Sequence, residues 1–243
     1  MRGCRGRNAR RNGEPVSARP ARTARQQEVL RALGIEVWQR REPAPDTADR
    51  RLTDAEPPDW AALRAAVRDC RRCELHRSRT QTVFGVGDES AAWMIVGEAP
   101  GAEEDRQGEP FVGPAGQLLN EMLRAAGASR EQVFIANILK CRPPDNRDPQ
   151  PGEVAACADH LAAQIRLVAP RLILAVGRIA AQNLLGQDLP VGRLRGRVHR
   201  WGPAGIPLVV TYHPAYLLRS PMEKRKAWDD LRLALSVALP VKP

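Results

Sequence analysis

One stretch of this sequence concentrates residue types that could do chemistry. Residues 97–116 read GEAPGAEEDRQGEPFVGPAG and hold five glycines, five carboxylates and a lone aromatic side chain, Phe111. Glycines let the backbone approach a ligand closely or adopt positive φ. The stretch lacks the G-x-x-x-x-G-K-[ST] and G-x-G-x-x-G patterns, and its acids would repel phosphate. The cluster therefore suits a pocket in which a carboxylate holds water or stabilises positive charge.

Four cysteines form a second candidate site. Cys70 and Cys73 make a C-x2-C pair, and Cys141 and Cys157 follow with fifteen residues between them. Zinc and a [4Fe–4S] cluster both accept four thiolates, and the spacing does not choose between them. Buried free thiols or a redox pair are the alternatives. Structural disulfides are not expected in a cytosolic chain.

The elements that must position these residues alternate between strand-like and helix-like patterns. Apolar runs predict strands at 93–96, 133–137, 172–176 and 207–212, and helical spacing predicts helices at 59–75, 115–127, 152–169, 177–186 and 222–238. Strands that are apolar throughout are typical of a sheet covered by helices on both faces. The order predicts an α/β fold, a three-layer α/β/α sandwich on a four-stranded, mainly parallel sheet. Ligands bind such sheets at the carboxyl ends of the strands.

Charge divides the chain into two parts. Residues 1–25 carry eight arginines and one acid, so they hold most of the formal net charge of +10. We expect residues 1–58 to be a basic, largely disordered extension with a short helix at 26–41 and a linker. Residues 59–240 are expected to be the folded domain. The basic arm suggests affinity for polyanions, and a merely solvated tail is the alternative.

Targeting signals are not evident in the sequence. No apolar run approaches the length of a membrane span, and the N-terminus has no secretory core. We therefore expect a cytoplasmic protein, nucleoid-associated if it binds DNA, that is a monomer without a membrane partner.

The motifs together resemble a known family. The stretch 97–116, the four cysteines, NILKCRPPDNR at 137–147 and HPAYLLR at 213–219 are similar to segments of the family 4 uracil-DNA glycosylases, the iron–sulfur type of bacteria and archaea. The resemblance covers about residues 60–238. It implies a uracil-DNA glycosylase fold, a [4Fe–4S] cluster on the four cysteines, and excision of uracil from single- or double-stranded DNA.

The resemblance also implies roles in binding the base. Phe111 would stack on a flipped-out uracil, and Asn137 would read its Watson–Crick edge. A neutral His213 would donate to uracil O2 and stabilise the charge that develops on the base. Gly97 and Ala99 would line this subsite. Apart from the motif, Phe111 could cap the core, Asn137 could be a turn residue and His213 a structural one.

The group that serves the sugar is less sharply defined. Ala99 stands where several related glycosylase families have an aspartate, and an alanine cannot orient water. The candidates, alone or together, are Glu98, Glu104, Asp105 and the amide of Asn146. Among them we expect Glu98, backed by Glu104, to orient the water or balance an oxocarbenium-like sugar. For Glu104 and Asp105 the alternative is a solvated loop face or a cap on the following structure.

DNA contacts are expected from Arg142, Leu217 and Arg219. The segment 216–219, with Leu217 and Leu218, is expected to wedge into the duplex, and Arg219 to contact a phosphate. Alternatively, Leu217 and Leu218 belong to a short helix packed on the core. Lys140 is expected to be structural or phosphate-facing rather than a Schiff-base lysine. The leading hypothesis is a monofunctional DNA N-glycosylase of base excision repair. The alternative is a non-catalytic iron–sulfur protein that binds uracil-containing DNA.

Overall fold

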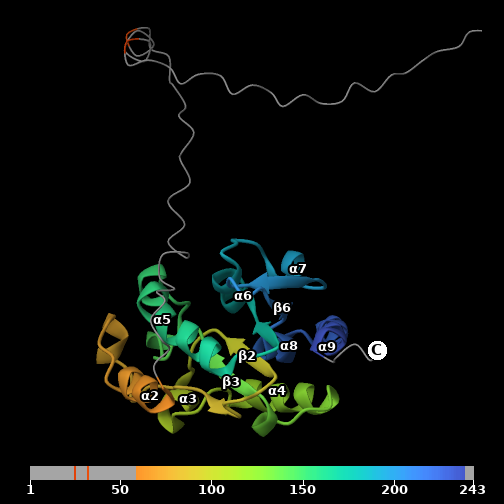
Figure 1. The fold of residues 1–243 in the computed structure, drawn as a ribbon, viewed down its shortest axis with the longest axis horizontal. Coiled ribbons are helices and arrows are strands. Elements are labelled where there is room, and N and C mark those ends of the chain that lie inside the picture. The colour runs from red at the N-terminus through yellow and green to blue at the C-terminus, as the bar shows by residue number, and fades with distance from the viewer. Residues whose placement is uncertain (1–24, 26–31, 33–58, 239–243) are drawn as a thin grey trace, which may run out of the picture. The chain divides into compact units, whose positions relative to one another are not determined.

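The computed structural model describes residues 59–238 and the isolated positions 25 and 32 (Figure 1). Apart from those two positions, the predicted N-terminal extension, with its short helix and linker, lies outside the described residues. The domain boundary at residue 58 therefore stays a prediction.

A six-stranded sheet with the order β1-β3-β2-β4-β6-β5 lies at the centre of the described residues. Its four central strands run parallel: β3 (Phe134–Asn137), β2 (Trp93–Gly97), β4 (Leu172–Val176) and β6 (Ile206–Thr211). These are the four strands that the sequence predicted. The antiparallel edge strands β1 (Val86–Gly87) and β5 (Val198–Trp201) correct the predicted strand number. Neither forms an apolar run, because β1 has two residues and β5 alternates exposed with half-buried side chains.

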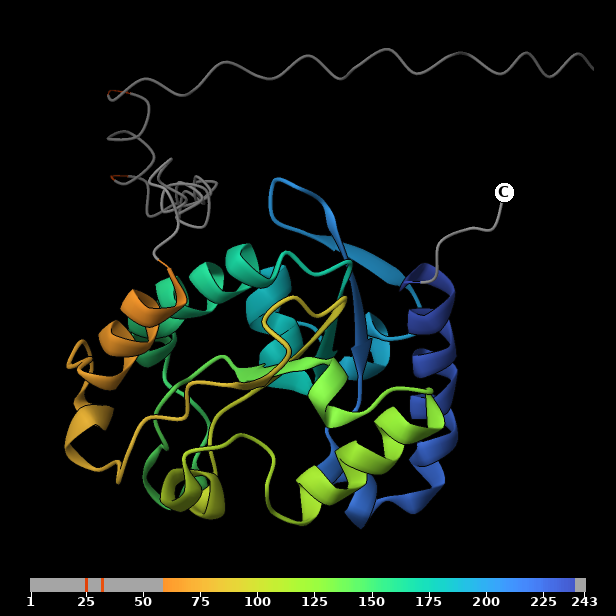
Figure 2. The same ribbon diagram turned by 60° about the horizontal axis from the view of Figure 1, so that its bottom comes forward.

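Helices cover both faces of this sheet, as Figures 1 and 2 show. One face carries α2 (Trp60–Arg68), α5 (Pro151–Val168), α6 (Arg178–Leu185) and α7 (Val191–Leu194). The other carries α4 (Pro114–Ala125), α8 (Pro214–Arg219) and α9 (Lys224–Ala238). The prediction of a three-layer α/β/α sandwich is confirmed.

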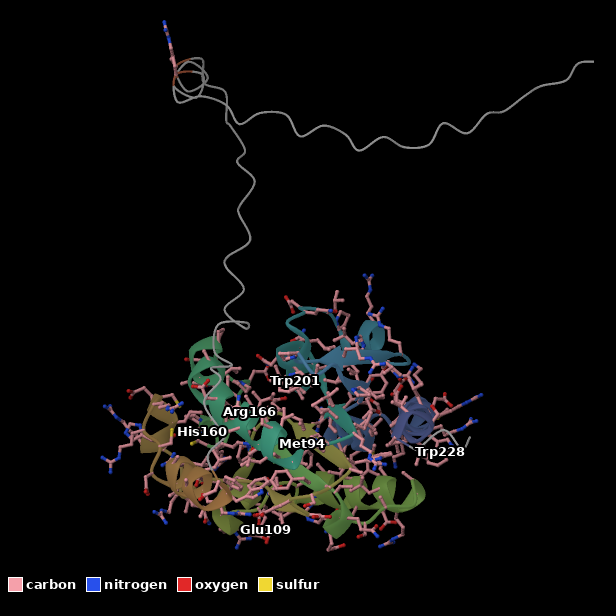
Figure 3. The ribbon with its side chains drawn as sticks, viewed as in Figure 1. Met94, Glu109, His160, Arg166, Trp201 and Trp228 are labelled. Carbon is pink, nitrogen blue, oxygen red and sulfur yellow. The ribbon has the colours of Figure 1, made fainter. Side chains whose placement is uncertain are left out.

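Strand β2 shows why the central strands are apolar throughout. Met94 and Val96 pack into the core on the α2 and α5 face, whereas Ile95 packs into the core on the α4 and α9 face. All three side chains are fully buried. Because each face meets a helix layer, neither tolerates the polar side chains of a half-solvated strand. Figure 3 labels Met94 within the sheet.

The remaining helical turns lie in the connections: η1 (Glu74–Arg77), α3 (Ala102–Gln107), η2 (Arg130–Gln132), η3 (Pro144–Asn146) and η4 (Pro221–Glu223). The helix predicted over 59–75 ends earlier, at Arg68, so the C-x2-C pair lies in the turn between α2 and η1. HPAYLLR forms the short helix α8, as the alternative reading of that segment expected. None of the described helices is both long and apolar enough to cross a membrane.

Candidate active site

A cavity of about 820 Å³ opens at the carboxyl ends of the parallel strands. The structure brings most of the predicted site residues to its wall: Glu98, Ala99, Glu104, Phe111, Asn137, Asn146, His213 and Arg219. Its size suits a small organic ligand together with part of a larger one. We call this cavity the base pocket, after the base-stacking role that the sequence predicts for Phe111.

Asn137 ends β3, and its side chain is 2% exposed. The side-chain oxygen Oδ1 has no hydrogen-bond partner among the described residues. Buried amides are nearly always paired, so an unpaired one at a cavity wall is poised to bind a polar ligand. Gly97 lies opposite Asn137 in the parallel register. A Cβ at Gly97 would lie 2.4 Å from Oδ1 and 2.6 Å from the Phe111 ring, so only glycine fits there.

Phe111 is held in a strained backbone conformation with φ 55°, which is rare for a bulky residue. The Arg130 guanidinium donates from Nη1 to the Phe111 carbonyl at 3.2 Å and from Nη2 to the Pro110 carbonyl. A Cβ at Gly116 would lie 1.7 Å from the Phe111 carbonyl oxygen, so α4 packs directly on this turn. Strain that neighbouring contacts impose in this way clusters at functional sites.

Glu104 binds the backbone of the loop that carries Phe111. Its Oε1 accepts from the backbone N–H groups of Val112 at 2.9 Å and Gly113 at 3.1 Å, and its Oε2 accepts from Gly101 at 3.1 Å. Because both oxygens are engaged by the backbone, the carboxylate positions the Phe111 loop. This contact pattern differs from the catalytic role expected from the sequence.

His213 is the N-cap residue of α8, and its Nδ1 accepts the backbone N–H of Ala215 at 3.2 Å. In the neutral ring the proton must then lie on Nε2. Burial, aided by the nearby Arg219, lowers the pKa of His213 to about 4, so the ring is neutral at physiological pH. The ring stacks on Phe111 with centroids 5.6 Å apart. The structure thus presents a neutral N–H donor beside the aromatic platform.

Glu98 directly follows β2 at the cavity wall. Burial, with a smaller contribution from the charge of Asp148 and against the opposing charge of Arg178, raises the pKa of this carboxyl to about 7. Arg178 forms an ion pair with Asp148. A carboxyl with a pKa near neutrality in a pocket is a general acid or base candidate.

Asn146 lies in η3 with φ 54°, and its Oδ1 accepts from Arg142 Nε at 2.8 Å. Arg142 therefore holds this amide, and Arg142 itself does not line the base pocket. Leu217, predicted as a DNA wedge, is 1% exposed because α8 packs it into the core beside α4 and α9. That prediction is wrong for Leu217, whereas its neighbour Leu218 is 45% exposed.

The four predicted cysteine ligands line one small cavity between the α2–η1 turn, the segment after β3, and α5. We call this the cysteine site. His160 of α5 also lines it, and Figure 3 labels that side chain. Within the described residues, no group of three or more His, Cys, Asp or Glu side chains is close enough to hold a metal ion. The shared cavity is the weaker but consistent finding, because it brings all four sulfur-bearing side chains to one space.

Two of the four sulfur atoms of the cysteine site each have an N–H donor nearby. Arg79 Nη1 lies 3.0 Å from Cys141 Sγ, and the backbone N–H of Lys140 lies 3.4 Å from Cys157 Sγ. Cysteine ligands bind metals as thiolates, which such cations and N–H groups stabilise. In residue type and number the four thiols match the ligand set of a four-thiolate metal or cluster site, although the described side chains do not converge closely enough to hold a metal ion.

Several residues of the site were not singled out by sequence reasoning. Arg130 lies in η2, nineteen residues beyond Phe111, and no local pattern links the two. The far wall of the base pocket consists of Tyr212 and residues 190–192. Tyr212 directly precedes His213, so its position at a strand end was the one available signal.

The fold and the base pocket define a class of protein, because an aromatic platform and an unpaired amide at the strand ends suit a nucleobase. Consistent with this, the family model described as the uracil DNA glycosylase superfamily matches residues 84–232. The chain is 45% identical over 173 residues to the type-4 uracil-DNA glycosylase of Archaeoglobus fulgidus, across 68% of this chain and 86% of the relative. It is also 45% identical over 173 residues to that of Thermotoga maritima, across 70% of this chain and 90% of the relative. The chain therefore belongs to the type-4 uracil-DNA glycosylase family.

Proposed function

We propose that this chain hydrolyses the N-glycosidic bond of deoxyuridine in DNA, releasing uracil and leaving an abasic site for base excision repair. The observation that carries this proposal is the buried, unpaired Oδ1 of Asn137 beside the Phe111 ring. The relatives named as type-4 uracil-DNA glycosylases support the same activity. A pocket of this kind takes a base extruded from the DNA stack.

The uracil stacks on Phe111 while Asn137 pairs with its Watson–Crick edge, the amide N–H2 on a carbonyl oxygen and Oδ1 on N3–H. Because the Oδ1 atom has no hydrogen-bond partner among residues 59–238, it is free to pair with the base. As the glycosidic bond breaks, its electron pair moves onto uracil, and His213 Nε2–H donates to O2 where that charge develops. Because the low pKa of His213 keeps the ring neutral, the histidine acts as a preorganised dipole.

Glu98 serves the sugar side of the reaction. In its ionised form the carboxylate stabilises the oxocarbenium-like C1′ and accepts a proton from the attacking water. The water oxygen forms the new bond to C1′, while the N1–C1′ bond breaks and uracil leaves with the electron pair. Asn146 lines the same cavity and orients the water through its amide. Ala99 leaves room beside this water without taking part.

The reaction is monofunctional in this proposal, with no strand cleavage. Lyase chemistry needs an amine at C1′, and no lysine lines the base pocket within the described residues. The nearby Lys140 has its Nζ bound to the Asn137 carbonyl and to Gln164. The abasic site is therefore the end product.

Cys70, Cys73, Cys141 and Cys157 would hold a [4Fe–4S] cluster in the cysteine site. A cluster bound there would cross-link the α2–η1 turn, the segment after β3 and α5, and the hydrolysis itself would need no electron transfer from it. These cysteines thereby fix the segment that carries Asn137.

Uracil-containing DNA, single- or double-stranded, is the partner. Arg219 lies at the wall of the base pocket, where it meets a phosphate, and of the two leucines expected to wedge into the duplex the exposed Leu218 keeps that role. The proposed acting form is a monomer, in which one chain lines the base pocket.

The test incubates the purified full-length protein with a single-stranded oligonucleotide that contains one uracil, followed by alkaline cleavage. Scission at the uracil only after alkali, absent with Asn137→Ala and with a thymine oligonucleotide, is the expected result. Iron and sulfide analysis of the same sample tests the cluster. Intact DNA that the protein still retards in a gel would instead favour the non-catalytic binding protein.

A further inference from the structure

A buried lysine lies between the base pocket and the cysteine site. Lys140 is 1% exposed and sits between Asn137, the predicted base reader, and the cysteine at 141. Its Nζ donates to the Asn137 backbone carbonyl at 2.8 Å and to Gln164 Oε1 at 2.6 Å. In the described part of the chain it forms no ion pair with a carboxylate. A buried ammonium with neutral partners is costly, so its retention calls for a physical reason.

The ammonium is fixed to two layers of the fold. Gln164 lies on α5, is fully buried, and donates from Nε2 to the Phe84 carbonyl at 2.8 Å. Its Oε1 is thereby aimed at Lys140. On the other side the Asn137 carbonyl ends β3, and the next residue, Ile138, donates its N–H to the Gly97 carbonyl at 2.9 Å. The lysine side chain therefore ties the backbone of Asn137 to α5.

The cysteine site, once loaded with a metal group, would supply a charge that balances this ammonium. Lys140 lines the same small cavity as the four cysteines, and its backbone N–H reaches Cys157 Sγ. Four thiolates around a zinc ion or an iron–sulfur cluster carry net negative charge. In a buried setting such a charge attracts an ammonium strongly, because screening by water is weak.

We propose that Lys140 is a positioning residue that couples the two sites: its ammonium compensates the charge of the loaded cysteine site and holds the Asn137 backbone in its base-reading position. This inference rests on the proposed glycosylase function for its Asn137 half. Removing the ammonium weakens the retention of the metal group and displaces the base reader at the same time.

The experiment compares the wild type with Lys140→Met, which keeps the length of the side chain and removes its charge and donors. Leu161→Ala is the matched control, because Leu161 is a buried core residue on the same helix α5 and lines neither the base pocket nor the cysteine site. The first readout is the half-time for loss of visible absorption and protein-bound iron in a chelator. The second is kcat and KM for uracil excision, each corrected for the iron-loaded fraction.

For Lys140→Met we expect iron loss about tenfold faster and kcat about tenfold lower with KM within twofold, the scale of one hydrogen bond to a charged group. Leu161→Ala should lower the unfolding midpoint while leaving both readouts within twofold of the wild type. If the two variants are indistinguishable in both readouts, Lys140 is only a core residue and the proposal is overturned.

Two further arms keep the test decisive. If Lys140→Met does not fold, Gln164→Met removes the second acceptor of the ammonium and should shift both readouts about threefold in the same directions; unchanged values overturn the proposal. If the wild type excises no uracil, the proposed function fails and the chelator readout alone decides. Faster iron loss in Lys140→Met would then support the charge coupling, and an equal rate would overturn it.

Discussion

The base pocket and the cysteine site are neighbours that share residues 137–141, yet their buried polar groups are treated in opposite ways. In the base pocket Asn137 Oδ1 has no partner among the described residues, and Phe111 is held at φ 55°. In the cysteine site the sulfur atoms of Cys141 and Cys157 already receive N–H donors from the protein. The base pocket thus keeps a buried acceptor unpaired, whereas the cysteine site pairs its buried sulfur atoms with donors of the protein itself.

This difference is the one expected between a site for a transient ligand and a site that would hold a permanent group. A base that enters and leaves must find unpaired partners in place, since reorganisation during the reaction would cost rate. A resident metal or cluster instead needs supporting donors at all times. The two sites touch at the backbone, where the Ile138 and Leu139 N–H groups donate to the Gly97 and Glu98 carbonyls.

The comparison predicts that side-chain changes in the base pocket abolish activity and leave the cysteine site intact. Asn137→Ala removes the base-reading amide, and we expect single-turnover excision to fall about a thousandfold, the upper range for one preorganised donor. The visible absorption per protein should not change, because the substitution keeps the backbone carbonyl that Lys140 binds. A variant that lost both activity and absorption would show that the two sites are not separable.

The pH dependence of uracil excision tests the role of Glu98 in the base pocket. Its pKa of about 7 means that the ionised fraction falls tenfold per pH unit below that value, so the excision rate should rise up to about pH 7 and then level. His213, with a pKa of about 4, stays neutral over this range and adds no step. Glu98→Gln should lower the plateau about a hundredfold, as for loss of general base catalysis, and give a flat profile.

The control for this profile is Asp148→Asn. In the wild type the negative charge of Asp148 helps to raise the pKa of Glu98, whereas the positive charge of Arg178 lowers it. The substitution removes the Asp148 charge and frees Arg178 from its ion pair with Asp148. Removing the charge should therefore move the midpoint of the pH–rate profile to lower pH while the plateau changes little. An unmoved midpoint would mean that another group controls the profile.

The two sites also differ in how far the sequence could predict them. The residue types of the cysteines and of the strand-end motifs indicate their chemistry directly. The four parallel strands could be predicted because both of their faces are buried, which makes their sequences apolar throughout. The strain at Phe111 was not predictable, since Arg130 and Gly116 impose it through tertiary contacts. The role of Glu104 depends on which backbone N–H groups its oxygens accept from, and the residue type alone does not indicate them.

The error at Leu217 has a similar origin. HPAYLLR contains adjacent leucines, and only the helical turn of α8 decides that Leu217 faces the core and Leu218 faces outward. A shift of one residue turns a side chain by about 100° around a helix of 3.6 residues per turn. The burial of Lys140 likewise could not be predicted, because the sequence does not indicate whether a lysine beside a predicted ligand points into the core or toward solvent.

Phe111 tests whether the strained platform acts by stacking. Phe111→Leu keeps an apolar side chain but removes the aromatic face, and base–aromatic stacking is worth about 1–3 kcal/mol. We expect kcat/KM for uracil excision to fall about tenfold to a hundredfold. Phe111→Tyr should retain most activity, since the ring is preserved. Equal activity of the leucine variant and the wild type would make the residue a core cap, the alternative that the sequence left open.

Arg219 is expected to have the smallest effect, because it meets the phosphate backbone and not the base. Arg219→Ala removes one cation from the wall of the base pocket, so affinity for uracil-containing single strands should fall a few-fold, and the slope of log affinity against log salt should decrease by about 0.7. Arg124→Ala is the matched control: Arg124 is paired with Glu121 on α4 and does not line the pocket. An Arg219→Ala variant with the salt slope of this control would show that the phosphate contact lies elsewhere. If the salt slope falls while kcat is unchanged, the residue that positions the DNA is separate from those that act on the base. The phosphate contact would then be a third functional region, beside the base pocket and the cysteine site.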